Sequence, residues 1–302
     1  MPVRTGVVAR GPAATRAEWA ARVRRIDDQG HDTLLLPDHL GQWPPLSPLV
    51  AAAAVCDRLR FGVQVLNNEF WNPVLLAREA AAADVLTDGR LELGFGAGHT
   101  AAEFAAAGIA YERPSARIAR LAEAVPLVRR LLAGETVDHD GRYGLSAARL
   151  ELPTVQHPVP VMIGGNGDTL LALAAREADI VGLVGFTAGT GRVHTDLSHF
   201  TWDGLADRIA HVRHHAGDRS GAIELSVLVQ HVEVTDDRRA AADRWADGGL
   251  DTSPLLDSPF VLLGTPADLA DQVARLGEVG VTYLTTFEPC AEALAVAVGK
   301  RA

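Results

Sequence analysis

Short apolar runs alternate with amphipathic stretches along nearly the whole chain. Eight of these runs are almost continuously apolar, which is typical of strands buried on both faces of a parallel sheet; they cover residues 4–9, 32–37, 59–66, 91–96, 159–165, 179–185, 223–230 and 281–287. Most are followed by helical spacing, as over residues 15–29, where apolar positions recur near every 3.6 residues and Gly30 ends the pattern. Eight strand–helix units in 302 residues predict an α/β fold of the (β/α)8 TIM-barrel class rather than a doubly wound sheet.

Two segments and one proline interrupt this pattern. Residues 139–157 have no clear period, and residues 187–201 form a polar stretch with glycines, so we expect both to cross the top of the barrel. The helical stretch that starts at Pro114 contains Pro126, which we expect to kink it. Because there is no low-complexity linker, residues 1–302 are predicted to form one domain.

The barrel prediction indicates where the chemistry should lie. Active sites of TIM barrels form at the carboxyl ends of the strands. The segments that follow the predicted strands are therefore the candidates, namely residues 38–43, 64–71, 96–100, 164–169, 185–196, 230–234 and 286–289.

Two glycine-rich turns fall in these segments. In "LELGFGAGHT" the glycines Gly94, Gly96 and Gly98 do not match the dinucleotide spacing G-x-G-x-x-G, and no acidic strand end follows about 20 residues later. Either they only permit a sharp turn, or they let backbone N–H groups approach a phosphate or a flat ring. "PVPVMIGGNGDT" repeats the pattern with Asp168 or Thr169 as a helix cap, and two such turns favour a ligand with an anionic group.

Histidines supply the candidate acid–base chemistry. In "LLLPDHLGQW", His39 follows the second strand beside Asp38, and it either transfers a proton near neutral pH or only packs. Trp43 would line a flat ring or pack in the core. "HVRHH" places three further histidines at helical spacing, but we expect them on an outer helix and predict no metal site.

Composition narrows the function classes. The hydrophobic content of 48% indicates a globular protein, and the net charge of −10 gives no basic surface for nucleic acid or anionic lipid. No signal-peptide pattern, no long apolar run and only two cysteines together predict a cytoplasmic protein. Lys300 is the only lysine, which argues against Schiff-base catalysis.

Several motifs together resemble the bacterial luciferase-like superfamily, whose barrel enzymes use reduced flavin mononucleotide (FMN) or the deazaflavin coenzyme F420. The similarity rests on "DTLLLPDH", on the block of residues 59–98, on "PVPVMIGG" with "AREADIVGL", and on "PFVLLGTPADLADQV". The block is most similar to the F420-dependent branch. The resemblance implies a barrel oxidoreductase acting on a small molecule, usually as a homodimer.

The resemblance also implies residue roles. Asp38, His39 and Trp43 would lie at the reactive ring, with His39 as the catalytic proton carrier. A non-proline cis peptide would fall at Gln64–Val65 behind the ring, and Asn67 would contact the ring or its side chain. The remaining cofactor-binding residues would follow the ribityl chain and phosphate: Gly96, Ala97, Gly98, His99, Met162, Ile163, Gly164 and Gly165.

The chain departs from the branch at one position. Sugar-phosphate dehydrogenases of this family carry a catalytic glutamate where this chain has His99, and they bind the sugar phosphate with lysines that are missing here. We therefore expect His99 to replace the glutamate or only to bond the cofactor, and we do not expect a sugar-phosphate substrate. The predicted function is F420-dependent hydride transfer to or from an unknown small organic molecule. The alternatives are an FMN-dependent monooxygenase served by a separate flavin reductase, a non-catalytic flavin- or deazaflavin-binding protein, and a barrel for an unrelated phosphorylated ligand.

Overall fold

Eight parallel strand positions close into a barrel in the computed structural model, which describes residues 3–186, 199–246 and 252–300. The barrel strands are β1 (Arg4–Val8), β2 (Thr33–Leu36), β3 (Arg60–Val63), β4 (Leu66–Asn67), β5 (Leu91–Gly96), β8 (Val161–Gly165), β9 (Ile180–Leu183), β10 (Glu224–Val229) and β13 (Val281–Phe287). The sheet closes because β3 pairs with both β2 and β5. All eight predicted runs form strands, and the predicted TIM barrel is confirmed.

The third predicted run is divided between β3 and β4. A cis peptide bond joins Gln64 to Val65 between the two halves, at the position that the family resemblance implies. The first half pairs with the start of β5 and the second with its end, so both occupy one strand position in the barrel.

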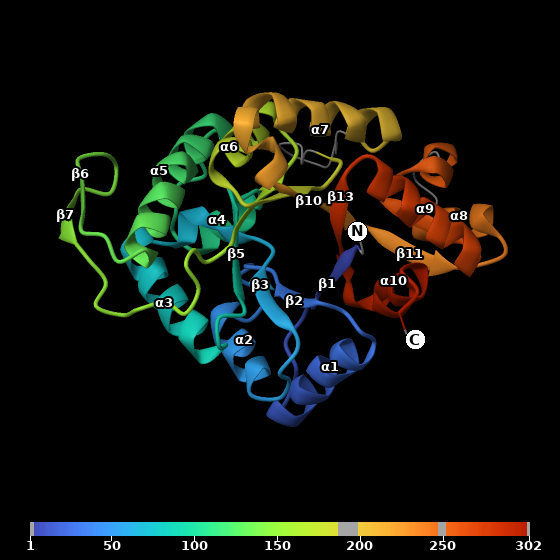
Figure 1. Ribbon diagram of the computed structural model, residues 1–302, viewed down its shortest axis with the longest axis horizontal. Coiled ribbons are helices and arrows are strands. Elements are labelled where there is room, and N and C mark those ends of the chain that lie inside the picture. The colour runs from blue at the N-terminus through green and yellow to red at the C-terminus, as the bar shows by residue number, and fades with distance from the viewer. Residues whose placement is uncertain (1–2, 187–198, 247–251, 301–302) are drawn as a thin grey trace.

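Helices surround the barrel (Figure 1). They are α1 (Arg16–Asp28), α2 (Leu46–Ala53), α3 (Pro73–Leu86), α4 (Ala101–Ala106), α5 (Pro114–Leu132), α6 (Asp168–Glu177), α7 (Trp202–Ala216), α8 (Arg238–Trp245), α9 (Pro266–Glu278) and α10 (Ala291–Ala297). Their starts follow ordinary capping chemistry, since Thr15, Asn72, Thr201 and Thr265 each accept a backbone N–H of the first turn. Short 3-10 turns η1 (Asn68–Phe70), η2 (Gly217–Ala222), η3 (Ser253–Asp257) and η4 (Glu288–Cys290) complete the connections.

Several details differ from the sequence predictions. Helix α5 continues from Pro114 to Leu132 as one element with Pro126 inside it. The segment expected over the barrel top, residues 139–157, starts at the end of β6 (Val137–His139) and contains β7 (Leu145–Ala148). This antiparallel pair lies on the outer side of α5 (Figure 1). That expectation was wrong, because contacts such as His139 Nε2 to Glu123 at 3.1 Å hold the pair against the helix.

The other expected excursion, residues 187–201, lies largely outside the described residues. The sequence reading also missed α9 and the parallel pair β11 (His231–Val234) and β12 (Val261–Gly264), which lies beside the barrel sheet.

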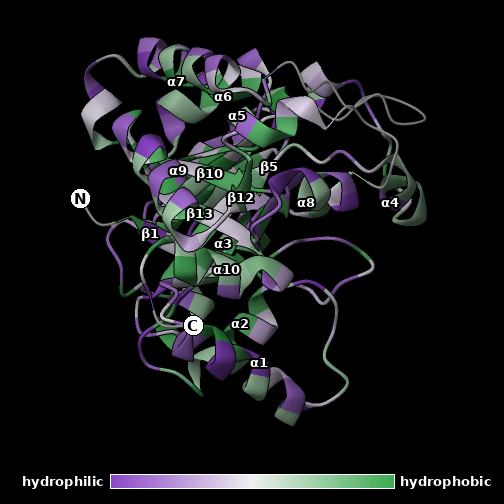
Figure 2. Cartoon of the chain, turned by 90° about the vertical axis from the view of Figure 1, so that its right-hand side faces the viewer, coloured by the Kyte–Doolittle hydropathy of each residue, from purple (hydrophilic) through white to green (hydrophobic). Residues whose placement is uncertain are grey.

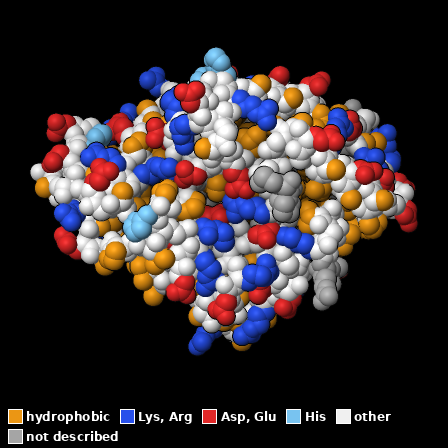
Figure 3. Space-filling view, viewed as in Figure 1, with side chains coloured by type: hydrophobic (Ala, Val, Ile, Leu, Met, Phe, Trp, Pro, Cys, Tyr) orange, Lys and Arg blue, Asp and Glu red, His pale blue; other side chains and the backbone are white. Residues whose placement is uncertain are grey.

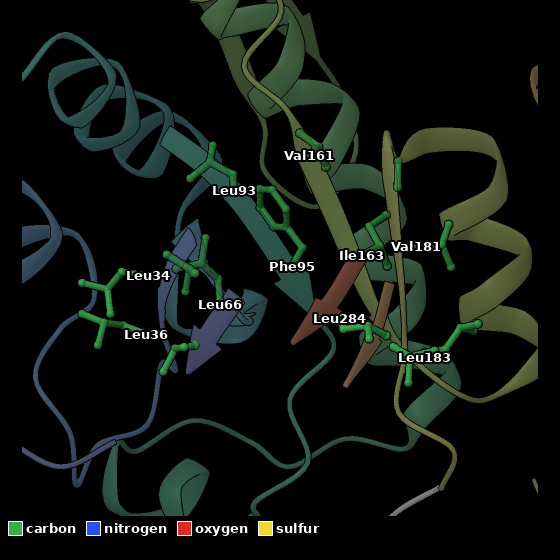
Figure 4. Packing of buried hydrophobic residues seen from close by; sticks show 14 of the residues in the cluster. Leu34, Leu36, Leu66, Leu93, Phe95, Val161, Ile163, Val181, Leu183 and Leu284 are labelled. Carbon is green, nitrogen blue, oxygen red and sulfur yellow. The ribbon is translucent and has the colours of Figure 1, made fainter. Parts of the chain in front are cut away.

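Two apolar cores hold the barrel together. The larger one fills the space between strands and helices, and Figure 4 shows part of it, with Leu93 and Phe95 on β5 and Val161 and Ile163 on β8. The smaller one lies on the opposite side of the strands, in the barrel interior, and comprises Val8, Leu35, Met162, Ile180 and Tyr283. Apolar residues accordingly concentrate along the strands in Figure 2. Burial of this kind is the main favourable contribution to folding.

Charged side chains close the amino-terminal end of the barrel. Arg4 donates to Glu92 at 2.7 Å and to Glu224 at 2.8 and 2.7 Å, and Arg60 donates to Glu92 at 2.6 Å. Lys300 lies at the same end, 2.5 Å from an Asp32 oxygen. The only lysine is thus far from the carboxyl ends of the strands where the site was predicted.

The outer surface carries both signs of charge. Basic and acidic side chains are interspersed on the face seen in Figure 3. Within the described ranges, no helix has the length and apolar character that crossing a membrane requires.

Candidate active site

The predicted site residues gather at the carboxyl ends of β2, β4, β5 and β8. Asp38 and His39 follow β2, which pairs with β3, while the next turns follow β4, β5 and β8 in barrel order. Parallel strands bring these turns to one mouth because all their carboxyl ends point the same way.

Asp38 connects the first two of these turns. Its carboxylate accepts the backbone N–H of Asn67 at 3.1 Å and the indole N–H of Trp71 at 2.8 Å. Burial raises the pKa of Asp38 despite these two donors. Its observed contacts fix the turn after β4. Trp71 lies at the end of the predicted segment of residues 64–71, but the sequence analysis gave it no role.

His39 is held by a carboxylate that the sequence analysis did not single out. Its Nδ1 lies 3.0 Å from both carboxylate oxygens of Glu103, which projects from α4. The Glu103 side chain is 19% exposed and that of His39 is 35% exposed, so the pair stands at the edge of the mouth. Since Nδ1 is engaged, Nε2 is the nitrogen left for another partner, and no described residue bonds it.

His99 lies next to this pair. The rings of His39 and His99 meet edge to face, with centroids 5.6 Å apart, and the backbone carbonyl of His99 accepts the hydroxyl of Tyr111 at 3.0 Å. Burial, with a smaller contribution from His39, lowers the pKa of His99. Two imidazoles and one carboxylate therefore share this part of the mouth, with the neutral form of His99 favoured.

Trp43 packs against the core of the protein. Its ring meets that of Trp19 at 5.7 Å and 78°, and it contacts the larger core. The packing alternative considered from the sequence is therefore observed, while a contact with a bound ring stays a prediction.

The alternating glycines are explained by close packing against the bulge between β3 and β4. A Cβ at Gly94 would lie 1.9 Å from the carbonyl oxygen of Val63, and one at Gly96 would lie 2.5 Å from a methyl of Val65. Gly164 faces the same side chain, with a Cβ distance of 3.1 Å. Packing alone therefore favours glycine at positions 94 and 96, because real Cβ atoms do not approach so closely, whereas a Cβ at Gly164 would require only a small shift of Val65.

Gly98 has a different reason. Its φ of +70° is the left-handed region that favours glycine, and a Cβ there would lie 2.4 Å from the side-chain oxygen of Asn67. Asn67 itself is 6% exposed and accepts the N–H of Glu69 at 3.2 Å.

The side chain of Gln64 has a buried oxygen that accepts no hydrogen bond from the described residues. Its amide nitrogen donates to Thr285 across the barrel at 3.1 Å, and its backbone N–H donates to Leu36 at 2.9 Å. The side-chain oxygen Oε1 is buried and unbonded among the described residues. Leaving such an acceptor unpaired costs about 1–3 kcal/mol, so a bound donor would be favoured here.

The turn after β8 offers mainly backbone. Met162 is buried in the inner core and Ile163 in the outer one, so any contact from them to a cofactor would come from their backbone. A Cβ at Gly165 would collide with Leu170 at 2.2 Å. In the turn after β5, the carbonyl oxygen of Ala97 accepts the Nε–H of Arg117 at 3.1 Å.

The cap predicted for the next helix was wrong. Gly167, not Asp168 or Thr169, is the N-cap of α6, and it has no side chain to accept the first N–H groups. Asp168 is the first helical residue and pairs with Arg208. The start of α6 therefore has backbone donors that the cap does not satisfy.

Two of the later predicted segments, residues 230–234 and 286–289, contribute to a cavity. It has a volume of about 580 Å³ and lies at the carboxyl ends of β1, β10 and β13, lined by Arg10, Arg25, Gln230, His231, Phe287, Glu288, Pro289 and Cys290. Of residues 185–196, all but the first two lie outside the described residues.

The three histidines of "HVRHH" lie on α7, where His211 Nε2 is 3.0 Å from the carbonyl of Asp168. Across the described ranges, no group of three or more His, Cys, Asp or Glu side chains is placed to hold a metal ion.

The comparison with known protein families agrees with the barrel fold and with the geometry of its mouth. The family model described as luciferase-like monooxygenase matches residues 3–253, and the chain belongs to this family. The predicted family and enzyme class, an oxidoreductase, are thereby confirmed.

Individual relatives narrow the comparison. An F420-dependent glucose-6-phosphate dehydrogenase from Nakamurella multipartita is 28% identical over 81% of this chain and 73% of its own length. One from Beutenbergia cavernae is 34% identical over 55% of this chain, which spans about half of that relative.

Solved structures share the fold. The coenzyme F420-dependent tetrahydromethanopterin reductase from Methanopyrus kandleri has a TM-score of 0.77 at 17% identity, with 99% of this chain and 97% of that one covered. A monooxygenase from Streptomyces bottropensis has a TM-score of 0.72 at 20% identity, covering 98% and 97%.

Proposed function

We propose that this chain is an F420-dependent oxidoreductase that transfers a hydride between the deazaflavin and a small organic molecule. The observation that carries the proposal is the His39–Glu103 pair, set at the barrel mouth beside the Gln64–Val65 bulge. The F420-dependent relatives support the choice of cofactor.

The mouth has groups that suit a phosphorylated deazaflavin. The unpaired Oε1 of Gln64 would accept a donor of the ring, and Val65 would form an apolar wall beneath it. The uncapped N–H groups at the start of α6 would bind the phosphate, as helix N-termini do. The cofactor would supply the hydride chemistry, and the protein would supply orientation and the accompanying proton.

His39 is assigned the proton. Its Nδ1 is bound to Glu103, so Nε2 would face the substrate and give or take the proton there. Glu103 is a positioning residue that fixes the ring plane and the protonated nitrogen. His99, with its lowered pKa, would act as a neutral hydrogen-bond partner rather than as a permanent cation.

We do not propose a sugar phosphate as the substrate, although the relatives described above are named glucose-6-phosphate dehydrogenases. The only lysine lies at the opposite end of the barrel, and a histidine stands at position 99. We propose instead a small reducible or oxidisable molecule without a phosphate, bound by a cytoplasmic homodimer formed from one-domain chains.

Two alternatives remain testable. The family description names monooxygenases, and one structure of the same fold is a monooxygenase in complex with FMN. The first alternative is therefore FMN-dependent oxygenation, which would require a separate flavin reductase. A non-catalytic carrier would bind the same cofactors and turn nothing over.

Equilibrium titration of the purified chain with F420 and with FMN separates these possibilities. We expect F420 to bind more tightly than FMN by a factor of ten or so, about 1.4 kcal/mol. Tight FMN binding without F420 binding would contradict the proposal. With F420 bound, His39→Ala should keep the affinity and lose turnover of a reducible-substrate panel, whereas a carrier shows no turnover in either form.

A further inference from the structure

A cysteine at the same end of the barrel, which the proposed hydride transfer does not use, lies close to a histidine and a carboxylate. The Sγ of Cys290 lies 3.6 Å from Nδ1 of His231, and Nε2 of His231 lies 3.1 Å from a carboxylate oxygen of Glu233. The three residues come from η4 and β11. A thiol, an imidazole and a carboxylate in this order are the groups by which cysteine nucleophiles are activated.

The cavity described above gives this group a space for a ligand. Cys290 and His231 both line it, beside the apolar surfaces of Phe287 and Pro289. We propose that Cys290 is a nucleophilic thiol that adds to small α,β-unsaturated carbonyl compounds entering this cavity. The inference does not depend on which cofactor the barrel binds.

The surroundings of the sulfur favour its charged form. Burial opposes the thiolate, but the hydrogen bond and charge of His231, with the Val232 backbone N–H, outweigh it and lower the pKa of Cys290. Conversely, Cys290 and Glu233 outweigh the effect of burial on His231 and raise the pKa of that imidazole. A thiolate beside an imidazolium is the reactive state of a cysteine.

Neighbouring side chains fix the pair. The indole of Trp245 stacks on His231 with centroids 6.0 Å apart and 18° between the planes. Glu233 is also bound by Arg244. The other charged groups facing the cavity are Arg10, which lies over the Phe287 ring at 3.6 Å, and Arg25, which pairs with Glu288.

The addition requires no reactant besides the thiol, the imidazole and the unsaturated carbonyl compound. The thiolate sulfur forms a bond to the β-carbon, and the π electrons of the carbon–carbon double bond move towards the carbonyl oxygen, where Arg10 can donate. The proton on Nδ1 of His231 then passes to the α-carbon. The result is addition of S–H across the double bond, with no oxidant and no leaving group.

Alkylation by N-ethylmaleimide tests the proposal on the full-length chain, with Cys56 as an internal control. Cys56 is buried too, but burial raises its pKa and no imidazole bonds it among the described residues. The rate at each cysteine is measured by peptide mass spectrometry at about pH 6 and pH 9. Because the thiolate fraction changes about tenfold per pH unit below the thiol pKa, we expect Cys290 to react at least about tenfold faster than Cys56 at pH 6.

The His231→Gln variant tests the cause. Its Cys290 rate should fall about tenfold or more at pH 6 and recover towards that of the unmodified sequence at pH 9, whereas a merely structural histidine would leave the pH profile unchanged. If that variant does not fold, Glu233→Gln should shift the profile in the same direction by less. Equal rates at the two cysteines, or an unchanged pH profile in the variant that folds, would overturn the proposal.

Discussion

Glu103 is the residue whose removal best tests the His39 assignment. Glu103→Gln keeps the size and one hydrogen bond but removes the charge that faces Nδ1 of His39. We expect kcat/KM to fall about 10- to 100-fold, since general acid–base catalysis contributes about 10²–10⁴-fold in total. The affinity for F420, measured by fluorescence titration, should stay within about twofold.

A matched control comes from the outer surface. Glu79 is exposed on α3, and within the described part of the chain its ion pair is with its neighbour Arg78, so Glu79→Gln should leave both quantities unchanged. Full activity in Glu103→Gln would show that the carboxylate does not support the proton transfer.

His31 makes the stability of the fold depend on pH. It is fully buried, contacting Thr5 and the carbonyl of Ala291, and burial lowers its pKa to about 4. The unfolded chain therefore binds this proton more readily, so the contribution of His31 is complete above about pH 6.5 and is lost as the pH falls towards 4. The shift corresponds to about 3 kcal/mol.

Urea unfolding at pH 7 and pH 4.5 measures this effect. We expect His31→Asn to lower the stability at pH 7 and to make its loss on acidification smaller than in the original chain. His214→Gln, an exposed change on α7, should keep the original slope. An unchanged slope in His31→Asn would assign the acid sensitivity to other groups.

For single residues, the sequence predicts where a side chain lies in the fold better than it predicts which side chain it contacts. His39 could be placed at the mouth because it follows a buried strand. Glu103 could not be paired with it, because 64 residues separate the two and only the closed barrel brings α4 over the turn after β2. The sequence did hold one local indication of Glu103. It lies four residues after His99, in the first turn of α4, and so close to the predicted glycine-rich turn.

Among the elements, strand β5 lies especially close to its neighbour β3 at Gly94. Gly94→Ala would place a methyl group 1.9 Å from the carbonyl oxygen of Val63, so backbone must move. We expect a loss of about 3 kcal/mol or failure to fold, as overpacked buried positions show. Thermal and urea unfolding provide the measurement.

A second glycine provides the comparison. Gly277 lies inside α9, and a methyl group added there would have no atom within 4 Å, so Gly277→Ala should stabilise the chain by about 0.5–1 kcal/mol. Equal effects of the two substitutions would show that the contact at Gly94 is not decisive.

The elements that the sequence predicted are those with the strongest apolar pattern. The barrel strands are buried on both faces, and helices such as α3 and α6 match their apolar stretches from end to end. Strands β6, β7 and β11 were missed because most of their residues are partly or fully exposed, so they form no apolar run. Strand β12 is a buried apolar run like the barrel strands, but its motif was noted only for the family resemblance.

For the molecule as a whole, Glu92 connects two strands at the amino-terminal end of the barrel, which is its floor. It is 3% exposed and accepts from Arg4 on β1 and Arg60 on β3. Glu92→Gln removes the charge that these two guanidinium groups share, and Arg4 keeps only Glu224 as its carboxylate partner among the described residues. We expect a loss of about 3 kcal/mol because a buried ion pair is broken. The exposed pair of Arg130 and Glu135 is the reference, with Glu135→Gln costing about 0–1 kcal/mol in the same urea experiment.

Closure of the barrel could be predicted from the count of eight strand–helix units. The distribution of charge between its two ends could not, because Arg4, Glu92 and Glu224 are far apart in sequence and meet only where the strands begin. An apolar pattern reports burial, while an ion network depends on the order of strands around the barrel.

The position of Lys300 has a practical consequence for handling the protein. As the only lysine, it lies at the floor of the barrel, 3.0 Å from the hydroxyl of Thr5, with 23% of its side chain exposed. Coupling through the lysine amine, to a dye or to an activated surface, would therefore mark one end of the molecule. Immobilised chains would share one orientation, with the proposed catalytic mouth pointing towards the solution.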